Sequence, residues 1–85
     1  MNREYIINLI DEINKIKLGS IVEITRDNEK HKYKVQYETD YDDIELVSID
    51  EKNTIWGSCG ETIKGLKEDI LCGGIYNRYQ KITVL

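Results

Sequence analysis

The sequence predicts an α+β fold with the element order helix, three antiparallel strands, helix and strand (αβββαβ). Two observations predict this class. Apolar residues recur with helical spacing at the start of the chain and again in its last third, and β-branched segments separated by polar turns fill the middle. Because each predicted helix has one apolar stripe, we expect both to cover one face of the sheet. The 85 residues suffice for one domain, residues 1–85, with a modest core.

Residues 3–18 are predicted to form the first helix, with Gly19 as a left-handed cap. Its apolar face has the 3-4-3 spacing of Ile6, Leu9, Ile13 and Ile16. The second helix is predicted to begin with Ser58 and Glu61 as a capping box and to end at Gly73-Gly74. Its apolar residues are Cys59, Ile63, Leu66 and Ile70.

The strands are predicted from β-branched or alternating segments. They comprise residues 20–26, 31–38, 44–49 and 76–84, with a turn at 27–30 and a loop at 39–43. Ile55 and Trp56 are expected to add a short extended piece. Tyr33 and Tyr37 share a face of the second strand and are expected to fill a core that has no phenylalanine.

The most specific feature of the chain is an acidic block at residues 38–61, which holds eight acids against one lysine. Its local charge of −7 exceeds the −4 of the whole chain, whereas residues 1–37 sum to +1 and residues 62–85 to +2. Such a block repels nucleic acid and attracts basic protein surfaces. We therefore expect a basic protein as partner and no direct binding of nucleic acid.

A docking surface is predicted around the loop at residues 39–43. Carboxylates there can stand in for phosphates and bind arginines through paired hydrogen bonds, and a central tyrosine can act as an aromatic anchor. The predicted interface consists of Glu38, Asp40, Tyr41, Asp42, Asp43 and Glu45, extended by Asp50, Glu51 and Trp56. The alternative is a solvated loop that only keeps the protein soluble.

Neither a metal site nor a cofactor is expected. Asp40-x-Asp42 begins like a calcium-binding loop, but the turn glycine and the terminal glutamate are missing at the required offsets. One histidine and two cysteines without a CxxC motif do not make a zinc site.

An enzyme is not expected either. A dyad of Cys59 and His31 would need an orienting third residue and an oxyanion site, and the sequence offers neither. Cys59 is instead predicted to pack on the apolar face of the second helix. Cys72, near the end of that helix, is open to an intermolecular disulfide on air exposure, although both thiols stay reduced in a cytoplasmic protein.

Four cations mark the first predicted hairpin: Arg26, Lys30, Lys32 and Lys34. The order of elements around them is similar to that of a double-stranded-RNA-binding domain. That module needs a lysine cluster at the start of its second helix, where this chain has Glu61-Thr62-Ile63-Lys64. The hairpin lysines are therefore expected to pair with acids across the strands.

The chain also resembles the small acidic inhibitors that phages deploy against bacterial defence, in particular the anti-CRISPR proteins that block RNA-guided nucleases. The similarity rests on size, an Ile/Lys/Asn-rich composition, the opening Met1-Asn2, the element order and the acidic stretch. The ending Tyr76-Asn77-x-x-Gln80-x-Ile82-Thr83 is similar to the C-terminal part of one such inhibitor. The resemblance implies that an acidic surface occupies an arginine- and lysine-lined channel meant for DNA.

We therefore expect a non-enzymatic, protein-binding inhibitor of the anti-CRISPR type, which acts as a DNA mimic on a basic host protein. The alternative is an adaptor or immunity-type module that binds through apolar and aromatic surface, as a monomer or homodimer. The N-terminus lacks the features of a signal peptide, and no stretch approaches the ~20 apolar residues of a membrane span. We expect a cytoplasmic protein, in the host cell if phage-encoded, without a membrane partner.

Overall fold

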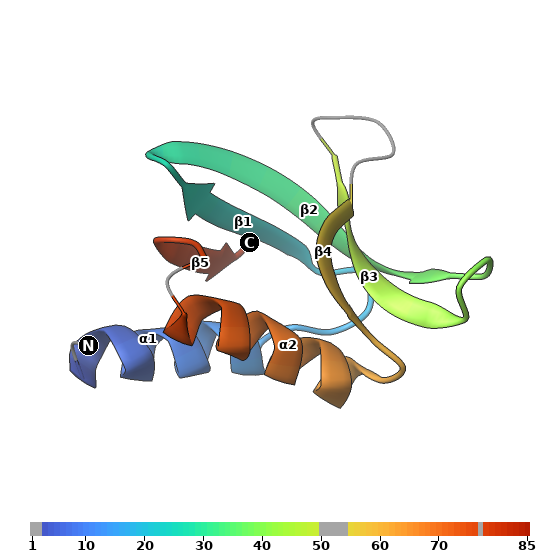
Figure 1. The fold of residues 1–85 in the computed structure, drawn as a ribbon, viewed down its shortest axis with the longest axis horizontal. Coiled ribbons are helices and arrows are strands. Elements are labelled where there is room, and N and C mark those ends of the chain that lie inside the picture. The colour runs from blue at the N-terminus through green and yellow to red at the C-terminus, as the bar shows by residue number, and fades with distance from the viewer. Residues whose placement is uncertain (1–2, 50–54, 77) are drawn as a thin grey trace.

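The computed structural model describes residues 3–49, 55–76 and 78–85, and of residues 55–58 the backbone alone (Figure 1). In chain order the elements are α1 (Arg3–Asn14), β1 (Ile21–Arg26), β2 (Glu29–Glu38), β3 (Asp43–Ser48), β4 (Ile55–Gly60), α2 (Ile63–Ile75) and β5 (Lys81–Val84). The predicted α+β class is confirmed. The predicted strand count is wrong, because a fourth strand, β4, precedes α2.

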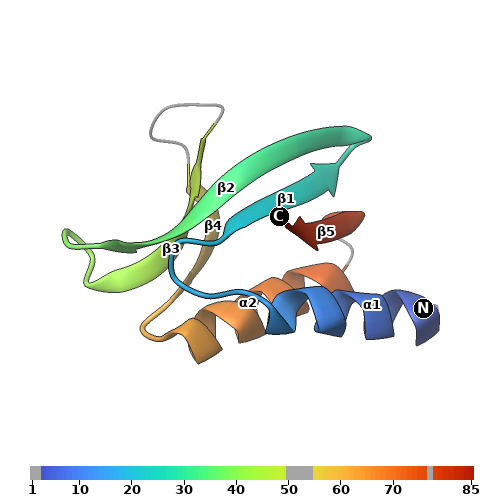
Figure 2. The same ribbon diagram turned by 180° about the vertical axis from the view of Figure 1, so that it is seen from behind.

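The five strands form one antiparallel sheet in the order β4-β3-β2-β1-β5. Neighbouring strands up to β4 follow one another along the chain, whereas α2 carries the chain from the β4 edge to β5 at the opposite edge. The two helices lie side by side on one side of the sheet, seen from the front in Figure 1 and from behind in Figure 2. The expectation that both helices cover one face is therefore confirmed.

Helix α1 ends four residues earlier than predicted, at Asn14. Gly19 does have a left-handed φ of 90°, but it lies in the connection to β1 and not at the helix end. There its N–H donates to the carbonyl oxygen of Val35 at 2.8 Å, and the hydroxyl of Ser20 accepts from the N–H of Lys17 at 3.0 Å. The first of these contacts holds the connection against β2. The apolar spacing that predicted a longer helix extends to Ile16, and Ile16 is buried although the helix has already ended.

Helix α2 begins four residues later than the predicted capping box requires. Its N-cap is Thr62, whose Oγ1 accepts a hydrogen bond from the N–H of Gly65 at 3.1 Å. The segment that contains Ser58 belongs to β4, where pairing with β3 satisfies backbone groups that a cap would otherwise serve. Gly60 makes the junction possible, because a Cβ there would lie 2.3 Å from the nitrogen of Leu66.

The end of α2 also differs from the prediction, because the helix runs through the glycine pair to Ile75. Gly74 is buried where α1 and the C-terminal segment meet, and a Cβ on it would lie 2.5 Å from Leu9 Cδ2 and 2.8 Å from the hydroxyl of Tyr79. That hydroxyl donates to the carbonyl oxygen of Ile70 at 2.8 Å. Burial raises the pKa of Tyr79. The glycine therefore serves a close approach and does not end the helix.

The core lies between the sheet and the helix pair. Its buried residues are Leu9, Ile13, Ile16, Val22, Ile24, Tyr33, Val35, Ile44, Leu46, Leu66, Ile70, Tyr79 and Ile82. Tyr33 fills the core as predicted, but Tyr37 is 49% exposed near the end of the β2–β3 hairpin, where its hydroxyl reaches Asp42 in the turn. The second core tyrosine is Tyr79 instead.

Neither described helix, α1 or α2, is long and apolar enough to cross a membrane.

Candidate functional site

The predicted interface residues gather at the free end of the β2–β3 hairpin. We call this group the acidic tip, defined as Glu38, Asp40, Tyr41, Asp42, Asp43 and Glu45. Residues 39–42 form the turn, which is closed by the cross-strand pair of Glu38 and Asp43. Asp42 has a left-handed φ of 51°, a conformation that aspartate adopts more readily than most residues.

The outer part of the acidic tip is open to solvent. Asp40 and Asp42 are exposed, and Tyr41 between them is 69% exposed. The hydroxyl of Tyr37 donates a hydrogen bond to Oδ1 of Asp42, and this bond raises the pKa of Tyr37. The turn is thus fixed from the strand, while an aromatic ring and two carboxylates face outward.

The inner part of the acidic tip is enclosed. Asp43 is half-buried, and Glu45 is only 6% exposed. Glu38 accepts a hydrogen bond from Nε2 of Gln36, the residue opposite Glu45, at 2.7 Å. The structure therefore divides the predicted acids into an exposed turn and an enclosed cluster on the strands.

The three residues predicted to extend the interface lie wholly or partly outside the part of the chain that the structure describes. Asp50 and Glu51 lie outside the described residues. The backbone of Trp56 belongs to β4, and its side chain lies outside the described part of the chain.

Cys59 lies on β4 opposite Glu45, not on a helix as predicted. Its N–H donates to Oδ2 of Asp69 on α2 at 3.3 Å. Burial and the negative charges of Asp43, Asp69 and Glu45 raise the pKa of the Cys59 thiol, which opposes a reactive thiolate. Asp69 was not singled out in the sequence, since nothing local to α2 indicates that it meets a strand edge.

The Cys59/His31 dyad is not assembled. The strand register places Cys59 level with Gln36 of β2, through Glu45. His31 lies five residues along β2 from Gln36, which is about 17 Å at a rise of about 3.4 Å per residue, and on the opposite face. Cys72 is exposed on α2, and both cysteines are free thiols. Among residues 3–49, 55–76 and 78–85, no group of three or more His, Cys, Asp or Glu side chains is arranged to hold a metal ion.

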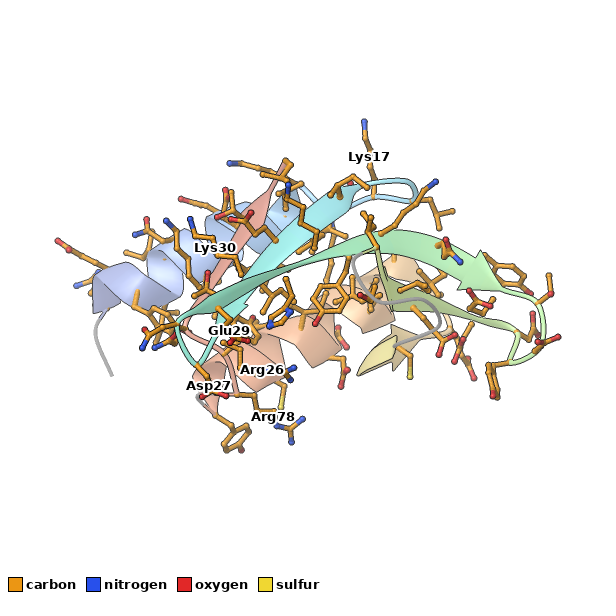
Figure 3. All side chains as sticks on the ribbon, turned by 90° about the horizontal axis from the view of Figure 1, so that it is seen from above. Lys17, Arg26, Asp27, Glu29, Lys30 and Arg78 are labelled. Atoms are coloured by element: carbon orange, nitrogen blue, oxygen red, sulfur yellow. The ribbon has the colours of Figure 1, made fainter. Side chains whose placement is uncertain are left out.

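The other end of β2 carries charges of both signs. Figure 3 shows Arg26, Asp27, Glu29, Lys30 and Arg78 together near the β1–β2 turn. Arg26 and Glu29 are cross-strand partners, and the Nε2 atom of His31 lies 3.6 Å from a carboxylate oxygen of Glu29.

The predicted pairing of hairpin lysines with acids is only partly seen in the strand register. Lys32 stands opposite Glu23, whereas Lys30 faces Thr25 and Lys34 stands between Ile21 and Val47.

A groove that the sequence did not indicate lies between α1 and β5 and has a volume of about 620 Å³. Its lining includes Asn8, Glu12, Lys15 and Lys81. Glu12 accepts hydrogen bonds from Lys15 and, at 3.1 Å, from the N–H of Val84 on β5, and these contacts lower the pKa of Glu12. A carboxylate that takes an N–H of an edge strand protects that edge against pairing with another chain.

Comparisons with known proteins do not extend this picture. No family model, no curated protein and no solved structure matches the chain. The resemblance to anti-CRISPR inhibitors thus remains an expectation from the sequence, and the candidate site rests on the geometry of the acidic tip.

Proposed function

We propose that this protein is a non-enzymatic inhibitor that binds a basic surface of another protein through its acidic tip. The observation that carries the proposal is the exposed Tyr41 between the exposed Asp40 and Asp42, held at the far end of a long hairpin. An exposed aromatic ring flanked by carboxylates suits arginine, which stacks on rings and pairs with carboxylates. The basic surface in this proposal is a nucleic-acid-binding site of a host protein, such as the DNA channel of an RNA-guided nuclease.

The test replaces the charges of the acidic tip while preserving its backbone. In a triple variant, Asp40→Asn, Asp42→Asn and Asp43→Asn, asparagine keeps the hydrogen-bond acceptor and tolerates the left-handed φ of Asp42. A matched control makes the same change in charge at exposed acids elsewhere, Asp11→Asn, Glu61→Gln and Glu68→Gln.

Both variants are compared with the unmodified chain in binding to, and inhibition of DNA cleavage by, a panel of purified RNA-guided nucleases. We expect the triple variant to lose inhibition and the control to keep it, with binding by the unmodified chain weakening as salt is raised. Equal inhibition by the triple variant would show that the acidic tip is not the interface. Failure of the unmodified chain to inhibit any nuclease of the panel would reject this class of target.

A second candidate function is an adaptor that binds through apolar surface. The observation in its favour is the exposure of Ile7 (49%), Ile10 (39%), Ile75 (39%) and Tyr76 (70%) on or next to the helix pair. Because salt does not screen apolar burial, such binding would barely change with salt and would respond to Ile10→Asp but not to the triple variant.

A further inference from the structure

The enclosed part of the acidic tip contains two carboxyl groups, those of Asp43 and Glu45, whose negative charges would be poorly solvated. Oδ1 of Asp43 and Oε2 of Glu45 are both shielded from solvent, and neither has a hydrogen-bond partner. The two side chains project on the same face of β3, and Glu38 stands opposite Asp43 on β2. Two ionised carboxylates in this position would be costly, because an unpaired buried oxygen forfeits its hydration.

Among the side chains that the structure describes, none next to the pair carries a positive charge to offset this cost. The described groups that face the pair are Glu38 and Gln36 on β2, Cys59 on β4 and, beyond Cys59, Asp69 on α2. Neither carboxylate takes part in the described ion pairs, Lys15 with Glu12 and His31 with Glu29. Both oxygens are shielded from solvent, and a proton bound by one carboxyl group would remove the repulsion between the two.

We propose that Asp43 and Glu45 hold one proton in common, and that docking of a cationic partner on the acidic tip displaces this proton. The first half concerns the isolated chain, and the second half rests on the proposed function. A protonated Glu45 can donate its O–H to the Asp43 carboxylate, which supplies the missing hydrogen bond without any change of fold. A nearby guanidinium favours the doubly ionised pair and releases the proton to solvent.

The direction of titration agrees with this geometry. Burial, the charges of Asp43 and Glu38 and the hydrogen bond that the protonated side chain makes to Asp43 raise the pKa of Glu45. The folded state then binds this proton more tightly than the unfolded chain does. The free energy of unfolding therefore falls as pH rises from the unfolded glutamate pKa, about 4.3, through the raised folded value. Glu12, whose pKa is lowered by its hydrogen bond from Lys15, has the opposite effect and loses its stabilisation as pH falls.

The first experiment needs no partner. Carboxyl carbon resonances are followed by NMR through a pH titration of the unmodified chain, Glu45→Gln, Asp43→Asn and the control Glu12→Gln. We expect the Glu45 carboxyl to titrate above the usual carboxyl range, and Asp43→Asn, which removes the carboxylate that accepts its proton, to bring that titration back toward the ordinary range. Glu12→Gln should leave the titration of Glu45 unchanged. Titration of Glu45 in the ordinary range in the unmodified chain would overturn the shared proton.

Stability gives a second readout of the same pair. Glu45→Gln keeps the shape of the side chain and removes the charge, so its midpoint of urea unfolding at neutral pH should rise and lose much of its decline with pH. The control Glu12→Gln should lower the midpoint. A lower midpoint for Glu45→Gln would mean that the ionised carboxylate stabilises the fold, contrary to the proposal.

The second experiment measures the coupling with a synthetic oligo-arginine peptide as probe, by calorimetry in two buffers with different heats of ionisation. We expect release of up to one proton per bound peptide and an affinity that rises with pH by at most about tenfold per unit. Whatever binding Glu45→Gln retains should proceed without this release, because the glutamine amide has no proton to lose. Binding without proton release would overturn the coupling and leave the docking function standing. Absence of binding would overturn both coupling and docking, while the NMR titration alone decides the shared proton.

Discussion

The two turns of strand β2 lie at opposite ends of the same hairpin ribbon and differ in how their charges are balanced. At the β1–β2 end, charges of both signs are interspersed, and the side chain of Gln80 bonds to the turn. At the β2–β3 end, the acidic tip contains carboxylates and no cation, and the hydroxyl of Tyr37 donates a hydrogen bond to Asp42. Opposite charges at the β1–β2 end attract one another and stabilise the fold. The like charges of the acidic tip repel one another, and folding alone does not require such repulsion.

The local backbone shows the same difference. The β1–β2 turn consists of Asp27 and Asn28, both with left-handed φ values of 54° and 64°, which is the two-residue turn that matches the twist of paired strands. The β2–β3 turn has four residues, with Asp42 as its left-handed member. A tight turn defines the register of β1 and β2, while a longer one presents side chains to solvent.

The largest effect is expected from breaking the tight turn. Asp27→Val places a β-branched side chain at a left-handed φ, which should lower the free energy of unfolding by about 1–3 kcal/mol. Asp27→Gly is the control, because glycine adopts this φ without strain. Urea unfolding followed by circular dichroism measures both variants. Equal stability of the valine and glycine variants would show that the turn conformation does not limit the fold.

A smaller effect on stability is expected from removing the hydrogen bonds between Gln80 and that turn. Gln80 accepts a hydrogen bond from the N–H of Asn28 at 2.8 Å and donates to its side-chain oxygen at 3.3 Å. Gln80→Ala should cost about 1 kcal/mol and speed hydrogen exchange of the Asn28 amide. Amides of residues 39–42 provide an internal control, since they lie at the other end of β2. A uniform change at both ends would mean that Gln80 acts through global stability alone.

Features of the fold that depend on local sequence patterns were predicted correctly, whereas features that depend on contacts between distant segments were not. The alternation of β2 identified Tyr33 as a core residue, and Tyr33 is buried. The same alternation predicted Tyr37 to be buried, but Tyr37 is 49% exposed, because its burial depends on contacts with segments distant in the sequence. The serine–glutamate spacing in residues 58–61 suggested a helix cap, but pairing with β3 is a long-range interaction that the spacing does not reveal.

The candidate site shows the same difference between what the sequence predicts and what depends on long-range packing. Composition alone located the acids of the acidic tip, and their cross-strand pairing follows from the hairpin. The enclosure of Glu45 and the approach of Asp69 to β4 depend on packing between distant segments, so the sequence could not separate the exposed acids from the enclosed ones.

The hydrogen bond that holds the turn of the acidic tip, from Tyr37 to Asp42, can be tested by removing one hydroxyl. Tyr37→Phe deletes the hydrogen bond to Asp42 and leaves the ring in place. Because that bond raises the pKa of Tyr37 in the folded state, its stabilisation is present below the ordinary tyrosine pKa of about 10 and is lost as pH rises through the folded value. Ultraviolet titration should show the loss of one late-titrating phenol. A titration curve that changes only by the loss of one ordinary phenol would contradict the bond.

The smallest effect on stability is expected from the exposed charges, and its sign should differ between the two ends of β2. Asp40→Asn with Asp42→Asn removes like charges from the acidic tip and should leave stability unchanged or slightly higher, within about 0.5 kcal/mol. Arg26→Gln with Lys30→Gln leaves Asp27 and Glu29 without their neighbouring cations and should lower stability by a similarly small amount. Both changes should shrink as salt is raised in urea unfolding, since these groups are exposed. If both pairs lowered stability alike, the charges of the acidic tip would contribute to folding as those of the other turn do, and the electrostatic argument for a docking surface would lose its basis.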